Sequence, residues 1–177
     1  GPLTYTVKVL GTDAAAGVVF EGTNYAGDAT FSTENVVSKS TLTAIPVDGK
    51  IAVVTVDKTT VYVSYFDANT KFYTIMNGKG GYVSLNSEYV SNGELKLSNK
   101  NTPRDNQGIW AFVKNGSAYK VYNYSTGLSK VIGMTGSEAS ARAKMVDPST
   151  SSYTIEFDGT LNFGNGEPSY IKWKGTS

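Results

Sequence analysis

Short runs that alternate apolar and polar residues follow one another along most of the chain. Tyr5–Val9 alternates strictly, and Ile51–Val56 and Val61–Phe66 are rich in β-branched and aromatic residues. Such runs predict β-strands, because successive side chains of a strand point to opposite faces. Asp48-Gly49 and Asp57-Lys58 lie where turns are needed between them. The pattern predicts an all-β fold built as a sandwich or a barrel.

The pattern of the sequence changes near residues 67–70, from strands without an internal repeat to repeated units. Residues 1–66 show strands and turns without an internal repeat, which predicts a small β-sandwich (Ig-like) domain. A repeat then begins, in which Tyr73–Asn77 is matched by Tyr119–Asn123 and, more weakly, by Leu161–Asn165. The period is roughly 45 residues. We therefore expect a second domain over residues 67–177.

Each unit of this repeat has room for four strands. Further predicted strands are Tyr82–Leu85, Glu94–Leu97, Ile109–Val113, Lys130–Gly133, Ala141–Val146, Tyr153–Phe157 and Tyr170–Trp173. A four-stranded unit of this length fits a propeller blade or a trefoil unit, and the chain is too short for four or more blades. We expect a β-trefoil-like domain with an incomplete third unit, which ends after its second strand about 20 residues short of closure.

Composition excludes several classes of function. The chain has no histidine and no cysteine, so it lacks the commonest general base, metal ligand and thiol nucleophile. We expect no enzyme activity, no cofactor and no metal site. The net charge of +1 predicts no attraction to nucleic acid. No apolar run is long enough for membrane insertion.

The abundance of Thr, Ser, Asn, Gly and Tyr, with only 18% charged residues, is typical of a secreted or cell-surface β protein. The opening Gly1-Pro2-Leu3 has the look of a scar left by a site-specific protease. We therefore expect the chain to be one piece of a larger parent protein, whose remaining domains are its partners.

A second motif, which contains Gln107 and Trp110, lies at the end of the first repeat unit and is followed by the start of the second unit. Gln107 and Trp110 are followed by the aromatic–aliphatic strand Tyr119–Asn123 and then by Thr126-Gly127. This order resembles the ricin-type β-trefoil lectin repeat, over about residues 71–177. Here two residues separate Gln107 from Trp110, whereas the family has one. The order of modules is similar to accessory regions of secreted Bacteroidetes glycosidases and proteases.

The resemblance implies a shallow sugar pocket in which an acid and an amide bind hydroxyl groups above an aromatic ring. No acidic residue directly follows the first strand of the repeat, so Asp105 would have to supply the acid. Trp110 is expected in the core instead, with a partner for its indole N–H. The candidate carbohydrate-binding residues are Asn77, Tyr89, Asn101, Asp105, Asn106, Asn123 and Tyr124.

Three functions stay open from the sequence. The first is a non-catalytic carbohydrate-binding module that targets a larger secreted protein to a glycan. The second is a structural spacer or protein-contact domain with a degenerate lectin fold. The third and weakest is a trefoil protease inhibitor. A lectin should expose an aromatic ring beside amide and carboxylate groups, whereas a spacer should expose a continuous apolar patch.

Overall fold

Strands dominate the computed structural model of the protein. It describes residues 1–12, 15–75, 82–91, 94–100, 105–115, 118–135, 142–148, 153–158 and 170–175. The helical elements within these ranges are three short 3-10 turns, η1 (Lys39–Thr41), η2 (Asp105–Gly108) and η3 (Gly127–Ser129). The predicted all-β class is confirmed.

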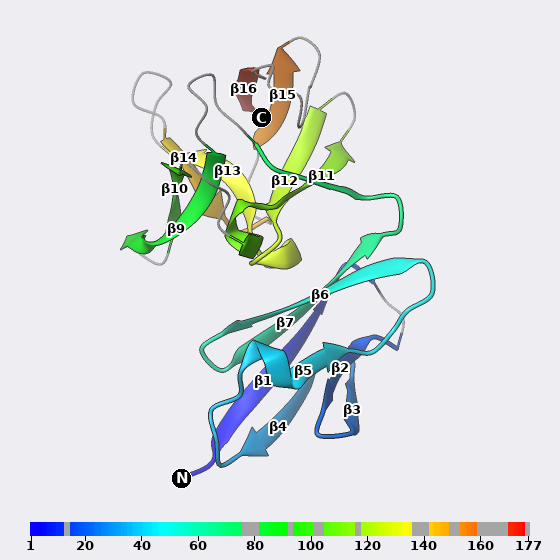
Figure 1. Ribbon diagram of the computed structural model, residues 1–177. Helices are drawn as coiled ribbons and strands as arrows, with labels where there is room; N and C mark the ends of the chain where they lie inside the picture. Colours follow the sequence, from blue (N-terminus) through cyan, green and yellow to red (C-terminus); the bar gives the residue numbers. More distant parts are fainter. Residues whose placement is uncertain are drawn as a thin grey trace. The chain divides into compact units, whose positions relative to one another are not determined.

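The chain divides into two compact units (Figure 1). The first consists of Gly1–Asn69 and Gly127–Ser129, and the second of Thr70–Thr126 and Lys130–Ser177. That residues 1–66 and 67–177 are separate folding domains stays a prediction.

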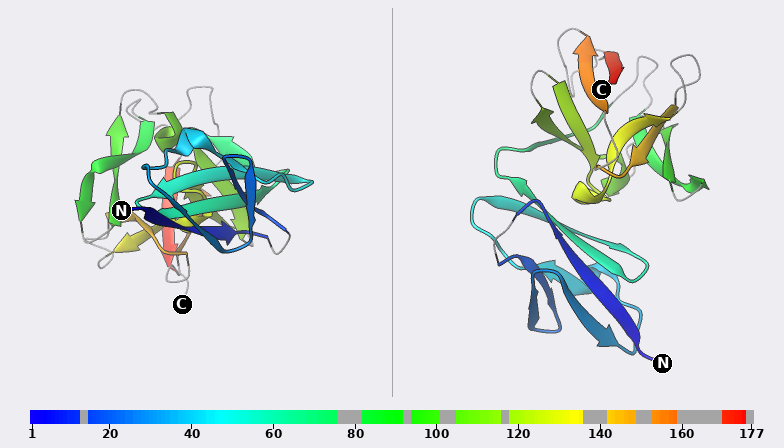
Figure 2. Two further views of the ribbon diagram at one scale, coloured as in Figure 1. Left: turned by 90° about the horizontal axis from the view of Figure 1, so that it is seen from below. Right: turned by 180° about the vertical axis from the view of Figure 1, so that it is seen from behind.

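The first unit contains two β-sheets (Figures 1 and 2). The larger has the order β4-β1-β7-β6, with β1 and β7 parallel and the other pairs antiparallel. The smaller has the order β3-β2-β5. Their bounds are β1 (Leu3–Leu10), β2 (Gly17–Phe20), β3 (Thr23–Ala26), β4 (Ala29–Thr33), β5 (Leu42–Ala44), β6 (Lys50–Asp57) and β7 (Thr60–Asp67).

Both sheets contribute to one hydrophobic core. Val7 and Val63 come from the larger sheet, and Val18 and Leu42 come from the smaller one. The alternation seen in the sequence explains this arrangement, because Tyr5 and Val7 of β1 and the alternate residues Val61, Val63 and Tyr65 of β7 are buried. The first unit is therefore consistent with the expected β-sandwich.

A buried tyrosine links the two sheets of the first unit. The Tyr65 hydroxyl donates to the Ile45 carbonyl oxygen at 2.6 Å and accepts the Gly17 N–H at 3.2 Å. Burial raises the pKa of Tyr65 above its ordinary value of 10.0, because the ionised form would lose its hydration.

Tight turns connect the strands of this unit. Glu21 and Gly22 both have positive φ, 50° and 78°, which suits the two-residue hairpin between β2 and β3. The turns expected at Asp48-Gly49 and after Asp57 are confirmed, and Gly49 and Lys58 adopt positive φ there.

The second unit contains a larger sheet system. Its strands are β8 (Lys71–Tyr73), β9 (Tyr82–Ser91), β10 (Glu94–Lys100), β11 (Trp110–Asn115), β12 (Ala118–Asn123), β13 (Val131–Thr135), β14 (Arg142–Val146), β15 (Tyr153–Asp158) and β16 (Tyr170–Gly175). The main path runs β16-β15-β12-β13-β14-β10-β9, and β11 pairs with both β12 and β8.

The pairing of these strands repeats along the chain. A first strand pairs with a fourth in β8–β11 and again in β12–β15. A second strand pairs with a third in β9–β10 and again in β13–β14. The fourth strand of one unit pairs with the first of the next in β11–β12. This repeated pattern is consistent with a trefoil-like fold.

Two strands differ from the sequence-based expectation. The first strand of the repeat begins earlier than predicted and spans Lys71–Tyr73, whereas Thr74 and Ile75 lie beyond it, where the carbonyl oxygen of Ile75 accepts from Val83 N. The rest of the predicted strand Tyr73–Asn77 lies outside the described residues. β16 pairs with β15 as β12 pairs with β11, so it takes a first-strand position rather than a second. The weak copy at Leu161–Asn165 lies outside the described residues.

Trp110 lies at the centre of the second core. Its side chain is fully buried, and its indole N–H donates to the Val83 carbonyl oxygen at 2.8 Å. The prediction that Trp110 is a core residue with a hydrogen-bond partner is confirmed. The other buried members of this cluster are Ile75, Leu85, Phe112, Val121, Ile132 and Met145.

Candidate functional site

The seven candidate sugar-binding residues fall into three groups. Asn77 and Asn101 lie outside the described residues. For Tyr89 on β9, and for Asp105 and Asn106 on η2, the structure describes the backbone. The remaining two, Asn123 at the end of β12 and Tyr124 directly after it, are described with their side chains.

Asn123 is a structural residue of the second unit. Its side chain is fully buried. Its amide N–H donates to the Gln107 carbonyl oxygen at 3.0 Å, and its amide oxygen accepts the Ser125 N–H at 2.9 Å. An asparagine that bonds the backbone two residues ahead stabilises a turn. Because both ends of the amide are used within the chain, a sugar hydroxyl has no access to Asn123, and we exclude it from the candidate site.

The bonds of this turn bring η2 next to the end of β12. Besides the contact of Asn123 with Gln107, the Tyr124 N–H donates to the Ile109 carbonyl oxygen at 2.8 Å. Asp105 and Asn106 directly precede Gln107 on η2. The structure therefore brings the backbone of η2, which carries Asp105 and Asn106, next to Tyr124.

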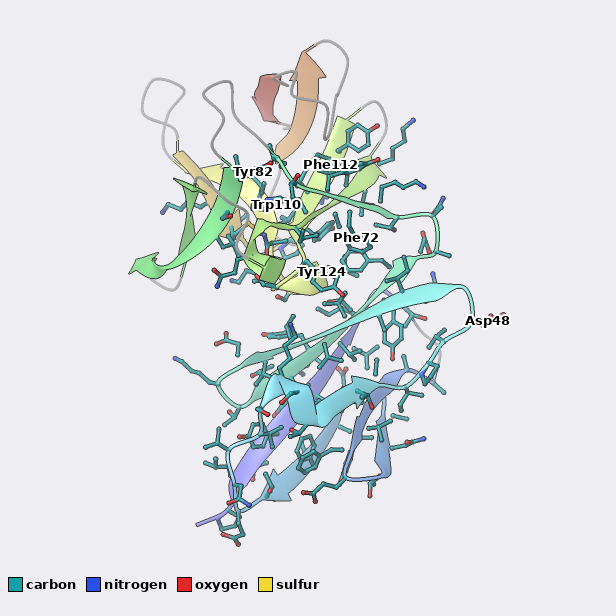
Figure 3. The ribbon with its side chains drawn as sticks, viewed as in Figure 1. Asp48, Phe72, Tyr82, Trp110, Phe112 and Tyr124 are labelled. Atoms are coloured by element: carbon teal, nitrogen blue, oxygen red, sulfur yellow. The ribbon has the colours of Figure 1, made fainter. Side chains whose placement is uncertain are left out.

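Tyr124 is paired with an aromatic ring from another strand. The rings of Phe72 and Tyr124 meet edge to face, with centroids 5.4 Å apart and planes inclined by 74° (Figure 3). This geometry is the favoured one for aromatic pairs. Both side chains are half-buried, so each keeps part of its surface open to solvent.

The strand register places a third aromatic residue on the same face. Phe72 lies opposite Ala111, and Ala111 lies opposite Tyr122. Residues directly opposite each other in a sheet share a face, and Tyr124 follows Tyr122 by two positions. We call Phe72, Ala111, Tyr122 and Tyr124 the aromatic face. The small, fully buried Ala111 at its centre leaves room for the rings around it.

The aromatic face is weakly polar. Burial raises the pKa of Tyr122 above 10.0, so its hydroxyl is neutral at physiological pH and can donate or accept a hydrogen bond.

Among the described residues, no three His, Cys, Asp or Glu side chains gather closely enough to hold a metal ion. No helix in the described ranges combines the length and apolar character needed to cross a membrane.

Two of the three aromatic residues of the aromatic face, Phe72 and Tyr122, were not among the sequence candidates. Phe72 lies on β8 and Tyr122 lies on β12. A large aromatic residue on a strand is ordinarily assigned to the core. Their position in the alternation of the strand is the signal that could have placed them on the opposite face from the core. Phe72 is adjacent to the core residue Tyr73, and Tyr122 is adjacent to the core residue Val121.

Comparison with known protein families, with curated proteins and with solved structures finds no match to this chain.

Proposed function

We propose that the chain is a non-catalytic carbohydrate-binding module that targets a larger secreted or cell-surface protein to a glycan. Its site is the aromatic face together with the adjoining turn η2. The single observation that carries the proposal is the half-buried Phe72–Tyr124 pair at the end of β12 beside η2.

The chemistry of this junction suits a sugar. Pyranose rings present an apolar face of C–H groups, which stacks on aromatic rings, and a rim of hydroxyls, which bind amides and carboxylates. Tyr124 and Phe72 offer the apolar surface, and Asp105 and Asn106 on the adjoining turn are residues of the type that binds hydroxyls. The ricin-type resemblance of residues 71–177 supports the same reading.

The exposure of apolar side chains favours this function over a spacer. A spacer should expose a continuous apolar patch. Among the described residues, Val36 is the one large apolar side chain that is mostly exposed, at 81%. A single exposed valine is ordinary for a protein surface. The rings of Phe72, Tyr122 and Tyr124, by contrast, are each partly exposed, and Tyr124 follows the end of β12 that contacts η2.

A glycan array followed by titration calorimetry tests the proposal. We expect saturable binding by the 177-residue chain and its loss in Tyr124→Ala, because that substitution removes one ring of the aromatic pair. Tyr25→Ala is the matched control, since it removes a half-buried tyrosine that packs on Phe31 in the first unit. An array without any saturable ligand, or equal losses in both variants, would contradict the proposal.

A further inference from the structure

A lysine stands on the aromatic face. Lys120 and Tyr122 are two residues apart on β12, so their side chains leave the strand on the same side. Val113 lies directly opposite Lys120, just as Ala111 lies opposite Tyr122. A two-residue step along a strand is about 7 Å, which is close to the width of one sugar ring with an exocyclic acid group.

Among the side chains that the structure describes, none forms an ion pair with the ammonium group of Lys120. In the first unit, by contrast, Lys8 pairs with Asp28 and Lys50 pairs with Asp67. The Lys120 side chain is half-buried. A lysine in this setting lays its methylene groups on apolar surface and presents its charge at the edge.

The strands that form the aromatic face carry only positive charge. β8, β11 and β12 contain three lysines, Lys71, Lys114 and Lys120, and no acidic residue. Lys71 lies opposite Phe112, a core residue, so alternation assigns it to the other side of the sheet. Lys114 lies opposite Tyr119, also on that other side. Of these three lysines, Lys120 is therefore the one that shares the face with Tyr122.

The next strand brings an acidic residue into the neighbourhood, and it has a basic residue opposite it. β15 pairs with β12 in antiparallel register through Ile155 and Tyr119, so Glu156 falls opposite Ala118, two positions before Lys120 on the same face. Lys172 lies directly opposite Glu156 on β16. Opposite charges at directly opposed positions are a favourable cross-strand pair, so Glu156 has a basic residue in register with it, whereas the residue opposite Lys120 on β11 is the uncharged Val113.

We propose that this site selects acidic glycans, in which a sugar ring stacks on Tyr122 and Tyr124 while its carboxylate or sulfate binds the ammonium of Lys120. The inference rests on the proposed function, since it names the class of glycan bound at the same aromatic face. A charge-assisted bond from lysine to an anion is stronger than a neutral hydrogen bond. Lys120 would therefore set specificity, and the aromatic rings would supply affinity common to all sugars.

The test compares oligosaccharides of equal length by titration calorimetry on the full chain. The probes are an oligogalacturonate, which carries carboxylates, a sulfated dextran oligomer and an uncharged dextran oligomer. We expect the wild type to bind one or both acidic probes about three- to ten-fold more tightly than the neutral one. Added sodium chloride should shrink that difference. Which acidic probe is preferred identifies the anionic group.

Two lysine variants locate the effect. Lys120→Gln should remove the preference for acidic probes and leave binding of the neutral probe unchanged. Lys114→Gln, which removes an exposed lysine from the other side of the same hairpin, should keep the preference. An unchanged preference in Lys120→Gln overturns the inference.

The remaining outcomes separate this inference from the proposed function. If acidic and neutral probes bind equally and Tyr124→Ala weakens both, the module binds glycans and the inference about acidic sugars fails. If none of the probes and no array glycan binds, both fail. A single-stranded oligothymidylate that binds as tightly as the acidic sugars would also overturn the inference, because the site would then recognise any polyanion.

Discussion

The side-chain amide of Asn123 donates a hydrogen bond of 3.0 Å to the main-chain carbonyl oxygen of Gln107. This contact ties the turn η2 to the end of β12, and so it sets the position of Asp105 and Asn106 relative to Tyr124. Asn123 is the asparagine at the end of the repeated strand Tyr119–Asn123. Its bonds give it a structural role rather than a contact with a ligand.

Asn123→Ala should destabilise the second unit. The substitution leaves the Gln107 carbonyl and the Ser125 N–H without their buried partner, which costs about 1–3 kcal/mol in the free energy of unfolding. Both tryptophans, Trp110 and Trp173, belong to the second unit, so urea unfolding followed by tryptophan fluorescence reports on it. Asn24→Ala, at an exposed position of β3, should change the free energy by less than about 0.5 kcal/mol.

Trp110 provides the clearest prediction about the core. Trp110→Ala should lower the free energy of unfolding by about 3–5 kcal/mol, because a fully buried indole is lost and leaves a cavity. Trp110→Phe should cost less, since it keeps most of the apolar volume and loses only the bond to the Val83 carbonyl. Trp173 remains as the fluorescent reporter in both variants. An unchanged melting temperature in Trp110→Ala would show that the residue is not part of the core.

Tyr65 should make the first unit sensitive to alkaline pH. Its pKa is raised in the folded state, so the unfolded chain releases this proton at a lower pH than the folded one. The stabilising contribution is therefore complete below the ordinary pKa of 10.0 and is lost as the pH rises through the folded-state value.

Tyr65→Phe separates this titration from the rest of the protein. It removes the hydrogen bonds to Ile45 and Gly17, so the variant should be less stable at neutral pH by about 1–3 kcal/mol. Its stability should decline less steeply than that of the wild type above the ordinary tyrosine pKa. Urea unfolding followed by circular dichroism across this pH range measures both effects, and parallel pH profiles would rule out the role of the Tyr65 proton.

The strands were predictable from sequence because the alternation of apolar and polar residues is local. Tyr119–Asn123 was predicted as a strand, and β12 spans Ala118–Asn123. The start of the repeat was less accurate, since the pairing of Phe72 with Ala111 depends on a strand nearly forty residues away in sequence. The position of β16 beside β15 was missed for the same reason, because it is set by partner choice and not by local pattern.

The candidate site was only partly predictable. Trp110 was correctly predicted as a core residue rather than a ligand contact, because large aromatic side chains are mostly buried. Its indole N–H has the expected partner, the Val83 carbonyl oxygen. It did not reveal that Asn123 is buried, since an asparagine at a strand end suits a turn and a ligand equally well. Phe72 was missed because its ring contact joins β8 to Tyr124 in the turn after β12, and β8 and β12 are brought together only through β11.

The Phe72–Tyr124 pair offers a test that does not depend on any ligand. Each single alanine variant should lower the stability of the second unit, and the double variant should lose less than the two together. The coupling free energy of this double-mutant cycle should be about 0.5–1.5 kcal/mol, the value of an edge-to-face aromatic pair. A cycle between Phe72 and Tyr25, which belong to different units, serves as the control and should show no coupling. If the Phe72–Tyr124 cycle is also additive, the two rings do not contact each other in solution, and the aromatic face loses the pair on which the glycan proposal depends.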